Sequence, residues 1–246
     1  MEKIIFAHRG MSSLAPENTI AAVRLCKRSG IEWFECDIDI LKDETIVISH
    51  DDTLDRCTNK KGSLYNITKE ELEKIDAGCW FGDEYLGERI PTLNELIKVI
   101  NEEKLNVNIE LKSCAAGKKL TEKLILGLVE ALKKLDKDRK VIVSSFNYLA
   151  LYLFKKLSPE TPVACLFETH TLYADCYSIL EFCEAEYIHP QNEGLTREKI
   201  QEMKDKGYKI NVWTVNSLAR ANELFNYGVD GVFTDIAHQF PKKYKK

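Results

Sequence analysis

The stretch of sequence that decides the fold is VNIEL at 107–111, LTEKLILGLVEALKKL at 120–135 and KVIVS at 140–144. The two short runs are rich in β-branched and apolar residues, which is typical of buried β-strands. The longer run carries leucines at helical spacing, at positions 120, 124, 128, 132 and 135, and they form one apolar stripe. Because a helical connection joins parallel strands, the stretch predicts one repeating unit of an α/β protein.

The same alternation extends along the whole chain. Two helix starts are marked by capping boxes, Thr68 with Glu71 and Thr92 with Glu95. A βα pattern repeated over about 250 residues predicts a closed (β/α)8 TIM barrel, and hence a single domain over residues 1–246. An open doubly wound sheet is the main alternative, but no GxGxxG follows the first strand. Seven further runs have the composition of strands: Ile4–Ala7, Trp33–Ile40, Ile46–Ser49, Val163–Phe167, Tyr187–His189, Ile210–Val215 and Gly231–Phe233.

One segment, residues 51–89, interrupts this alternation of strands and helices. It is polar, contains several glycines and is too long for a simple βα loop. We interpret it as a small insertion after the second barrel strand, lying over one face of the barrel, with a short helix after Thr68. The apolar run Cys79-Trp80-Phe81 is expected to form the small core of this insertion.

Composition and charge exclude several classes of protein. Apolar residues make up 44% of the chain and charged residues 30%, which is typical of a globular protein and not of a disordered one. The net charge of −4 gives no basic field that would recruit nucleic acid. No run approaches the roughly 18 apolar residues of a membrane span, so we expect no stable membrane association. The chain opens without the apolar run of a secretory signal and its eight cysteines include no CxxC pair, so we expect a cytoplasmic protein with reduced thiols.

Acidic side chains gather where two of the predicted strands end, which is where a TIM barrel carries its active site. Glu35 and Asp37 alternate along one strand and share a face, and Glu110 lies on the next barrel strand. Two ionised carboxylates about 4 Å apart repel by about 4 kcal/mol at an effective dielectric near 20. Some of the acids are protonated, or each acid has its own Arg or Lys partner, or a cation lies between them. We favour the cation, and an all-oxygen set suits magnesium or calcium.

Two histidines and two basic residues accompany these acids at strand ends. His8 and Arg9 follow the first strand, His50 follows a later short run, and Lys112 lies two residues beyond the third acid. Because imidazoles titrate near neutral pH, two of them can serve as general acid and general base. Arg9 and Lys112 supply fixed positive charge for phosphate oxygens. The set therefore predicts phosphoryl transfer with a divalent ion.

The same residues lie in seven ordered motifs, which run from about residue 3 to residue 236. The motifs are His8-Arg9-Gly10 through Ala15-Pro16-Glu17-Asn18-Thr19, Glu35-Cys36-Asp37, Ser49-His50-Asp51-Asp52-Thr53-Leu54-Asp55-Arg56, Pro91-Thr92-Leu93, Asn108-Ile109-Glu110-Leu111-Lys112, Val212-Trp213-Thr214-Val215-Asn216 and Gly231-Val232-Phe233-Thr234-Asp235. In this order they resemble the glycerophosphodiester phosphodiesterases. Met11-Ser12-Ser13 stands where members of that family often carry a glycine, and this departure removes no charged group.

This resemblance implies a (β/α)8 barrel with a small insertion and a metal-dependent hydrolase. The substrates would be glycerophosphodiesters such as glycerophosphocholine or glycerophosphoethanolamine, cleaved to sn-glycerol 3-phosphate and an alcohol. Carried over by motif, Glu35, Asp37 and Glu110 would hold one divalent cation, Mg²⁺ or Ca²⁺. His8 and His50 would be the catalytic acid–base pair.

The resemblance also implies how the substrate is held. Arg9 and Lys112 would contact the phosphate, and Trp213 would wall the glycerol side, with Phe146 as a weaker candidate for the same role. Glu17 would brace Arg9 or cap the following helix. The motifs leave open the head group, the choice of ion, the oligomeric state, and whether water or the glycerol 2-hydroxyl attacks phosphorus.

Two other functions are compatible with such a barrel. A related phospholipase C or D acting on lysolipids would need an exposed apolar lip, for which only the run 79–81 is a candidate. A catalytically silent barrel that binds phosphodiesters would have lost a histidine or a metal carboxylate, and all of these are present.

Overall fold

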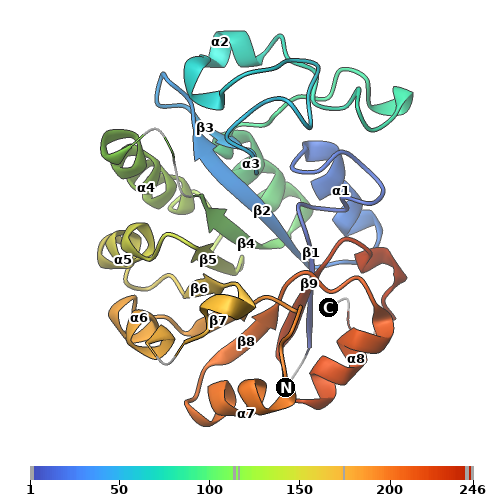
Figure 1. The fold of residues 1–246 in the computed structure, drawn as a ribbon. Coiled ribbons are helices and arrows are strands. Elements are labelled where there is room, and N and C mark those ends of the chain that lie inside the picture. Colours follow the sequence, from blue (N-terminus) through green and yellow to red (C-terminus); the bar gives the residue numbers. More distant parts are fainter. Residues whose placement is uncertain (1–2, 113–114, 116, 174, 242–243, 245–246) are drawn as a thin grey trace.

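Eight parallel strands close into a barrel in the computed structural model, which describes residues 3–112, 115, 117–173, 175–241 and 244. The strand order is β1-β9-β8-β7-β6-β5-β4-β2, and β1 pairs with both β9 and β2, which closes the cylinder. Helices lie outside the strands all round the barrel (Figure 1). The predicted (β/α)8 TIM barrel is therefore confirmed.

The strands are β1 (Ile4–Ala7), β2 (Trp33–Ile40), β3 (Ile46–Ile48), β4 (Asn106–Leu111), β5 (Val141–Ser145), β6 (Val163–Phe167), β7 (Tyr187–Pro190), β8 (Lys209–Val212) and β9 (Gly231–Thr234). The α-helices are α1 (Ile20–Arg28), α2 (Lys69–Leu72), α3 (Leu93–Glu103), α4 (Lys118–Leu132), α5 (Tyr148–Leu157), α6 (Cys176–Phe182), α7 (Arg197–Asp205) and α8 (Leu218–Asn226). Short 3-10 helices are η1 (Leu64–Asn66), η2 (Asp83–Tyr85), η3 (Thr169–Thr171) and η4 (Ala237–Gln239).

Most predicted strands match the observed strands within one residue at each end. The runs that begin at Ile46 and Ile210 differ from the other strands. The run that begins at Ile46 is not a barrel strand, since β3 pairs antiparallel with the far end of β2. The strand predicted over Ile210–Val215 ends at Val212, and Trp213 keeps only a single bridge to Gln191. Beyond Val212 the backbone still donates to its neighbours, from Trp213 N–H to the Pro190 carbonyl at 3.2 Å and from Val215 N–H to the Phe233 carbonyl at 2.8 Å, although the regular strand has ended.

Two sets of apolar side chains hold the barrel together. The larger fills the space between strands and helices and includes Val107 and Ile109 from β4 with Leu124 and Leu128 from α4. The smaller fills the barrel near the N-terminal ends of the strands, where Phe6, Trp33, Ile142, Ala164 and Phe233 are buried together.

The segment between β3 and α3 lies beyond the C-terminal end of β2 (Figure 1). Capping boxes start α2 at Thr68 and α3 at Thr92, as predicted. The expected core of the segment is wrong, because Trp80 is 40% exposed and its ring nitrogen donates to the carbonyl of Ala77. Aliphatic side chains are buried in its place: Leu41, Val47, Leu54, Leu64, Leu72 and Ile75. The Trp80 ring instead packs edge-on against Phe81, with ring centroids 5.5 Å apart, and does not join this aliphatic cluster.

Two further observations concern membranes and thiols. Across the described ranges, every helix is too short or too polar to cross a membrane. Cys114 lies outside the described residues, and the other cysteines are free thiols: Cys26, Cys36, Cys57, Cys79, Cys165, Cys176 and Cys183.

Candidate active site

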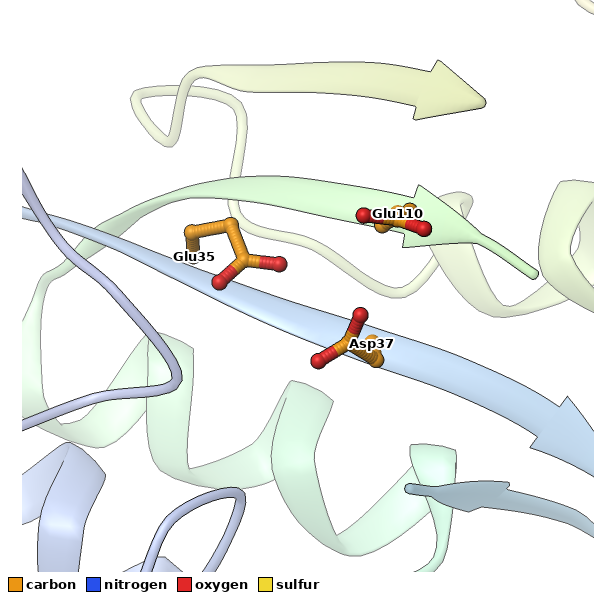
Figure 2. A group of neighbouring side chains, drawn as sticks. All are labelled: Glu35, Asp37 and Glu110. Carbon is orange, nitrogen blue, oxygen red and sulfur yellow. The ribbon is translucent and has the colours of Figure 1, made fainter. Parts of the chain in front are cut away.

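Strand register brings three carboxylates together. Asp37 on β2 pairs with Glu110 on β4, and Glu35 lies two residues earlier on the same face of β2. Figure 2 shows the three side chains converging from the two neighbouring strands. Their ligand oxygens all lie within 4.8 Å of one another, and Glu35 and Asp37 are buried. The sequence placed these acids on shared strand faces, and the β2–β4 register makes them neighbours.

Two basic side chains contact this cluster, but they do not give each of the three acids a partner of its own. The Lys112 ammonium is 2.9 Å from Glu110 and 3.7 Å from Asp37, and the Arg9 Nε is 3.5 Å from Asp37. The Glu35 carboxylate accepts a hydrogen bond from the backbone N–H of Arg9 at 2.9 Å. Apart from His8, whose Nε2 is 3.9 Å away, no cationic side chain of the described residues forms an ion pair with Glu35. The alternative of one partner for each acid is therefore not what the structure shows.

The protonation of the cluster follows from burial and from these neighbours. Burial, with the negative charges of Asp37 and Glu110, raises the pKa of Glu35 well above its usual value. Burial also raises the pKa of Glu110, and Asp37 adds to the effect. For Asp37 burial acts in the same direction, but Lys112 and Arg9 outweigh it and lower the pKa. Raised pKa values favour the protonated forms of Glu35 and Glu110 when no cation is near. A hard divalent ion bound between the three carboxylates would favour their ionised forms, and the oxygen donors fit such an ion.

His8 is held by a carboxylate from the last barrel strand. Its Nδ1 lies 2.7 Å from Asp235 Oδ1, and Asp235 also accepts from the Ser12 hydroxyl at 3.2 Å and the Asn216 amide at 2.6 Å. These hydrogen bonds lower the pKa of Asp235 to about 2, although burial acts against them. An ionised Asp235 accepts a proton from His8 Nδ1, which leaves Nε2 as the ring nitrogen on the side of Glu35, 3.9 Å from its carboxylate.

His50 has a similar arrangement on the other side of the site. Its Nδ1 lies 2.7 Å from Asp51 Oδ1, and Arg56 donates to the same carboxylate. The bonds from Arg56, followed by that from His50, lower the pKa of Asp51 to about 2. Burial lowers the pKa of His50 below its ordinary value. Neutral imidazole, able to take a proton at Nε2, is therefore its favoured form.

The loop after β1 adopts an unusual backbone to place Arg9. Arg9 has φ +56° and Gly10 has φ +77°, and a Cβ on Gly10 would come within 2.9 Å of the Ala22 backbone. Arg9 donates to Glu17 at 2.9 Å, so the bracing role expected of Glu17 is what the contacts show. Asn18 both donates to Asp37 Oδ2 at 2.9 Å and accepts from the Asp37 backbone. Left-handed backbone at a non-glycine residue is a feature of sites that need an exact orientation.

A cavity of about 110 Å³ opens between these groups at the C-terminal ends of the strands. Phe146 and Trp213 form one wall, with ring centroids 5.5 Å apart and an angle of 90° between the rings. The Trp213 ring is anchored by its N–H, which donates to the carbonyl of His189 at 2.8 Å. The lining is His8, Arg9, Glu35, His50, Asn108, Glu110, Ser144, Phe146, Leu166, Trp213, Thr214 and Phe233.

The structure brings every predicted site residue to this cavity or beside it. Asp37 and Lys112 do not line it but contact residues that do. Sequence reasoning assigned no role to Asp235, Asp51 or Arg56, although all three lie in the motifs quoted above. A carboxylate next to a histidine in sequence, as Asp51 is, was a usable signal; nothing local connects Asp235 with His8.

Known proteins match this chain over nearly its whole length. The model of the glycerophosphoryl diester phosphodiesterase family matches residues 8–238. A glycerophosphodiester phosphodiesterase of Caldanaerobacter subterraneus is 36% identical, with 96% of this chain and 95% of the relative covered. One from Bacillus subtilis is 31% identical, over 97% of this chain and 86% of the relative. The solved structure of an Oleispira antarctica phosphodiesterase, in complex with the product sn-glycerol-3-phosphate, superposes with a TM-score of 0.93 at 35% identity, covering 100% of this chain and 98% of that one.

Three findings support one assignment. They are the family match over nearly the whole chain, relatives above 30% identity at almost full length, and the shared fold. The enzyme class expected from the seven motifs is confirmed. This chain belongs to the glycerophosphoryl diester phosphodiesterase family.

Proposed function

We propose that this enzyme hydrolyses small glycerophosphodiesters, such as glycerophosphocholine and glycerophosphoethanolamine, to sn-glycerol 3-phosphate and an alcohol. The observation that carries the proposal is the cluster of three acids at one small cavity that two histidines also line, each histidine bonded to its own carboxylate. The Oleispira relative, which binds sn-glycerol-3-phosphate, supports the same product here.

The cation is part of this proposal. Glu35, Asp37 and Glu110 would hold one Mg²⁺ or Ca²⁺, and the donor set fits because all three ligands are carboxylate oxygens close enough to share an ion. When bound, such an ion supplies positive charge that polarises a phosphoryl oxygen. The family match supports the expectation of metal dependence.

The protein groups divide the remaining tasks. Arg9 and Lys112, held by Glu17 and Glu110, would bind the phosphate oxygens and neutralise the diester. One imidazole would take the proton of the nucleophile, which is water or the glycerol 2-hydroxyl, and the other would protonate the departing alcohol. The P–O bond to the head group breaks as the bond to the nucleophile forms. If the nucleophile is the 2-hydroxyl, this step gives a cyclic phosphate, and attack by water then opens the ring to sn-glycerol 3-phosphate. Trp213 and Phe146 would pack against the carbon chain of the glycerol.

A metal-free preparation tests the proposal most directly. Each of Mg²⁺ and Ca²⁺ is restored in turn with glycerophosphocholine, glycerophosphoethanolamine or lysophosphatidylcholine as substrate. Release of sn-glycerol 3-phosphate is followed for the first two, and release of choline or phosphocholine is followed for the lysolipid. We expect turnover of the first two only with an ion present. His8→Ala and His50→Ala should each lower kcat by about 10²–10⁴-fold, while the exposed His170, replaced by alanine, serves as a matched control.

Three outcomes would contradict the proposal. Faster turnover of the lysolipid would favour a phospholipase-type enzyme. No hydrolysis of any diester with either ion would favour a silent binding barrel. Full activity of both histidine variants would refute the acid–base assignment. The cytoplasmic location expected from the sequence stays a prediction.

A further inference from the structure

The guanidinium of Arg56 joins two carboxylates that come from separate loops. Its Nε and one terminal nitrogen donate to the two oxygens of Asp51, at 2.8 and 3.0 Å. Its two terminal nitrogens donate to the two oxygens of Glu17, both at 2.7 Å. Arg56 follows β3 in the chain, whereas Glu17 lies in the loop between β1 and α1. One planar group therefore makes two forked contacts at once.

Each of these carboxylates also holds a residue of the cavity. Asp51 Oδ1 is 2.7 Å from His50 Nδ1, and Glu17 Oε1 is 2.9 Å from an Arg9 terminal nitrogen. The contacts thus run without a gap from His50 through Asp51, Arg56 and Glu17 to Arg9. Arg56 itself does not line the cavity.

The geometry suits arginine and not lysine. A guanidinium presents its N–H donors in a fixed plane and can meet two carboxylates with two parallel bonds each, whereas an ammonium is a single point of charge. The bonds from Arg56 are the largest contribution that lowers the pKa of Asp51, and they act on Glu17 in the same direction. Both acids are thereby kept ionised, which is the form that holds an imidazole N–H or a guanidinium.

We propose that Arg56 is a positioning residue that fixes the places of His50 and Arg9 relative to each other at the substrate cavity. This inference rests on the proposed function, because it assumes that His50 transfers a proton and that Arg9 binds the phosphate. Through Asp51 it fixes the ring of the acid–base residue, and through Glu17 it fixes the phosphate-binding guanidinium. Misplacing groups of this kind typically costs 10–100-fold in activity.

The test compares Arg56→Gln with Arg24→Gln, a matched control on the barrel exterior. Arg24 also ties two elements together, since it donates to Glu102 and Glu103 of α3 from α1, and its side chain is 40% exposed against 46% for Arg56. With glycerophosphocholine as substrate, we expect Arg56→Gln to lower kcat about tenfold and to raise KM. Arg24→Gln should leave both constants unchanged, although each variant can lower the melting temperature.

Two further variants separate positioning from a merely structural role. In the His50→Ala background, adding Arg56→Gln should lower kcat no further while KM still rises, because Arg9 still depends on Glu17. Arg56→Lys keeps the charge but lacks the fork, so we expect it not to restore kcat. This variant also carries the test if Arg56→Gln does not fold.

The outcomes that overturn the inference are distinct from those that overturn the function. Equal losses of kcat from Arg56→Gln with and without His50, or full activity of Arg56→Lys, would show that positioning by the fork is wrong. An impaired His50→Ala beside an unimpaired Arg56→Gln would overturn this inference alone. An unimpaired His50→Ala would instead refute the catalytic role of His50 in the proposed function.

Discussion

Replacing Glu35 by glutamine should change the stability of the protein in opposite directions without and with a divalent ion. At 4.8 Å, the outer limit of separation among the three acids, an ionised pair repels by about 3.5 kcal/mol at an effective dielectric near 20. Neutralising Glu35 removes two of three such pairs, about 7 kcal/mol before any compensation. The positive charges of Arg9 and Lys112 lie against the same acids, and together with proton uptake by the acids they offset most of this repulsion. We expect a net gain of about 1 kcal/mol, or about 2–4 °C in melting temperature for a chain of this length.

With the ion bound, the sign reverses. A ligand present at one hundred times its Kd stabilises the folded state by about 2.7 kcal/mol, which corresponds to roughly 5–11 °C here. Glu35→Gln removes one of three anionic ligands, so most of this increase should be lost. The variant should therefore melt above the wild type in chelator and below it in saturating Mg²⁺ or Ca²⁺.

Calorimetric melting in chelator and across an ion titration checks both signs. Glu186→Gln is the control, because Glu186 pairs with the buried Lys155 far from the cavity and its replacement should lower the melting temperature equally in both conditions. The electrostatic reasoning is refuted if metal-free Glu35→Gln melts as far below the wild type as this control. A full ion-dependent increase in the variant would show that Glu35 is not a ligand.

Three other predictions concern single residues. Asp235→Asn should lower kcat about 10–100-fold with little change in KM, because the proton of His8 would no longer be fixed on Nδ1; steady-state kinetics check this, and unchanged kcat contradicts it. Trp213→Ala should raise KM for glycerophosphocholine more than it lowers kcat, since it removes one wall of the cavity; the reverse pattern would place the ring elsewhere in the mechanism. His189 is buried, and burial lowers its pKa to about 3. The unfolded chain therefore takes up a proton below about pH 6.5 that the folded chain does not. As the pH is lowered from about 6.5 to about 3, the free energy of unfolding falls by up to about 1.4 kcal/mol per pH unit. His189→Gln should flatten that slope, as measured by urea unfolding at pH 5 and pH 7, and an unchanged slope would assign it to other groups.

The sequence by itself determined the barrel and the chemistry of its strand ends. Alternating strands and helices carry their own periodicities, and these are local properties that need no partner. The same locality places Glu35 and Asp37 on one face of β2, and it identifies Asp51 as the neighbour of His50. Capping boxes at Thr68 and Thr92 were likewise readable, because both partners lie within three residues.

Only the tertiary structure decided which of these groups meet. Glu110 lies beside Asp37 because of the β2–β4 register, and Asp235 reaches His8 because β9 pairs with β1 when the barrel closes. Arg56 reaches Glu17 across 39 positions of sequence. Contacts between segments so far apart depend on how the whole cylinder closes, and no local spacing encodes that. The prediction that residues 79–81 form the core of the inserted segment was wrong for the same reason. Which apolar groups are buried depends on the surface that they pack against.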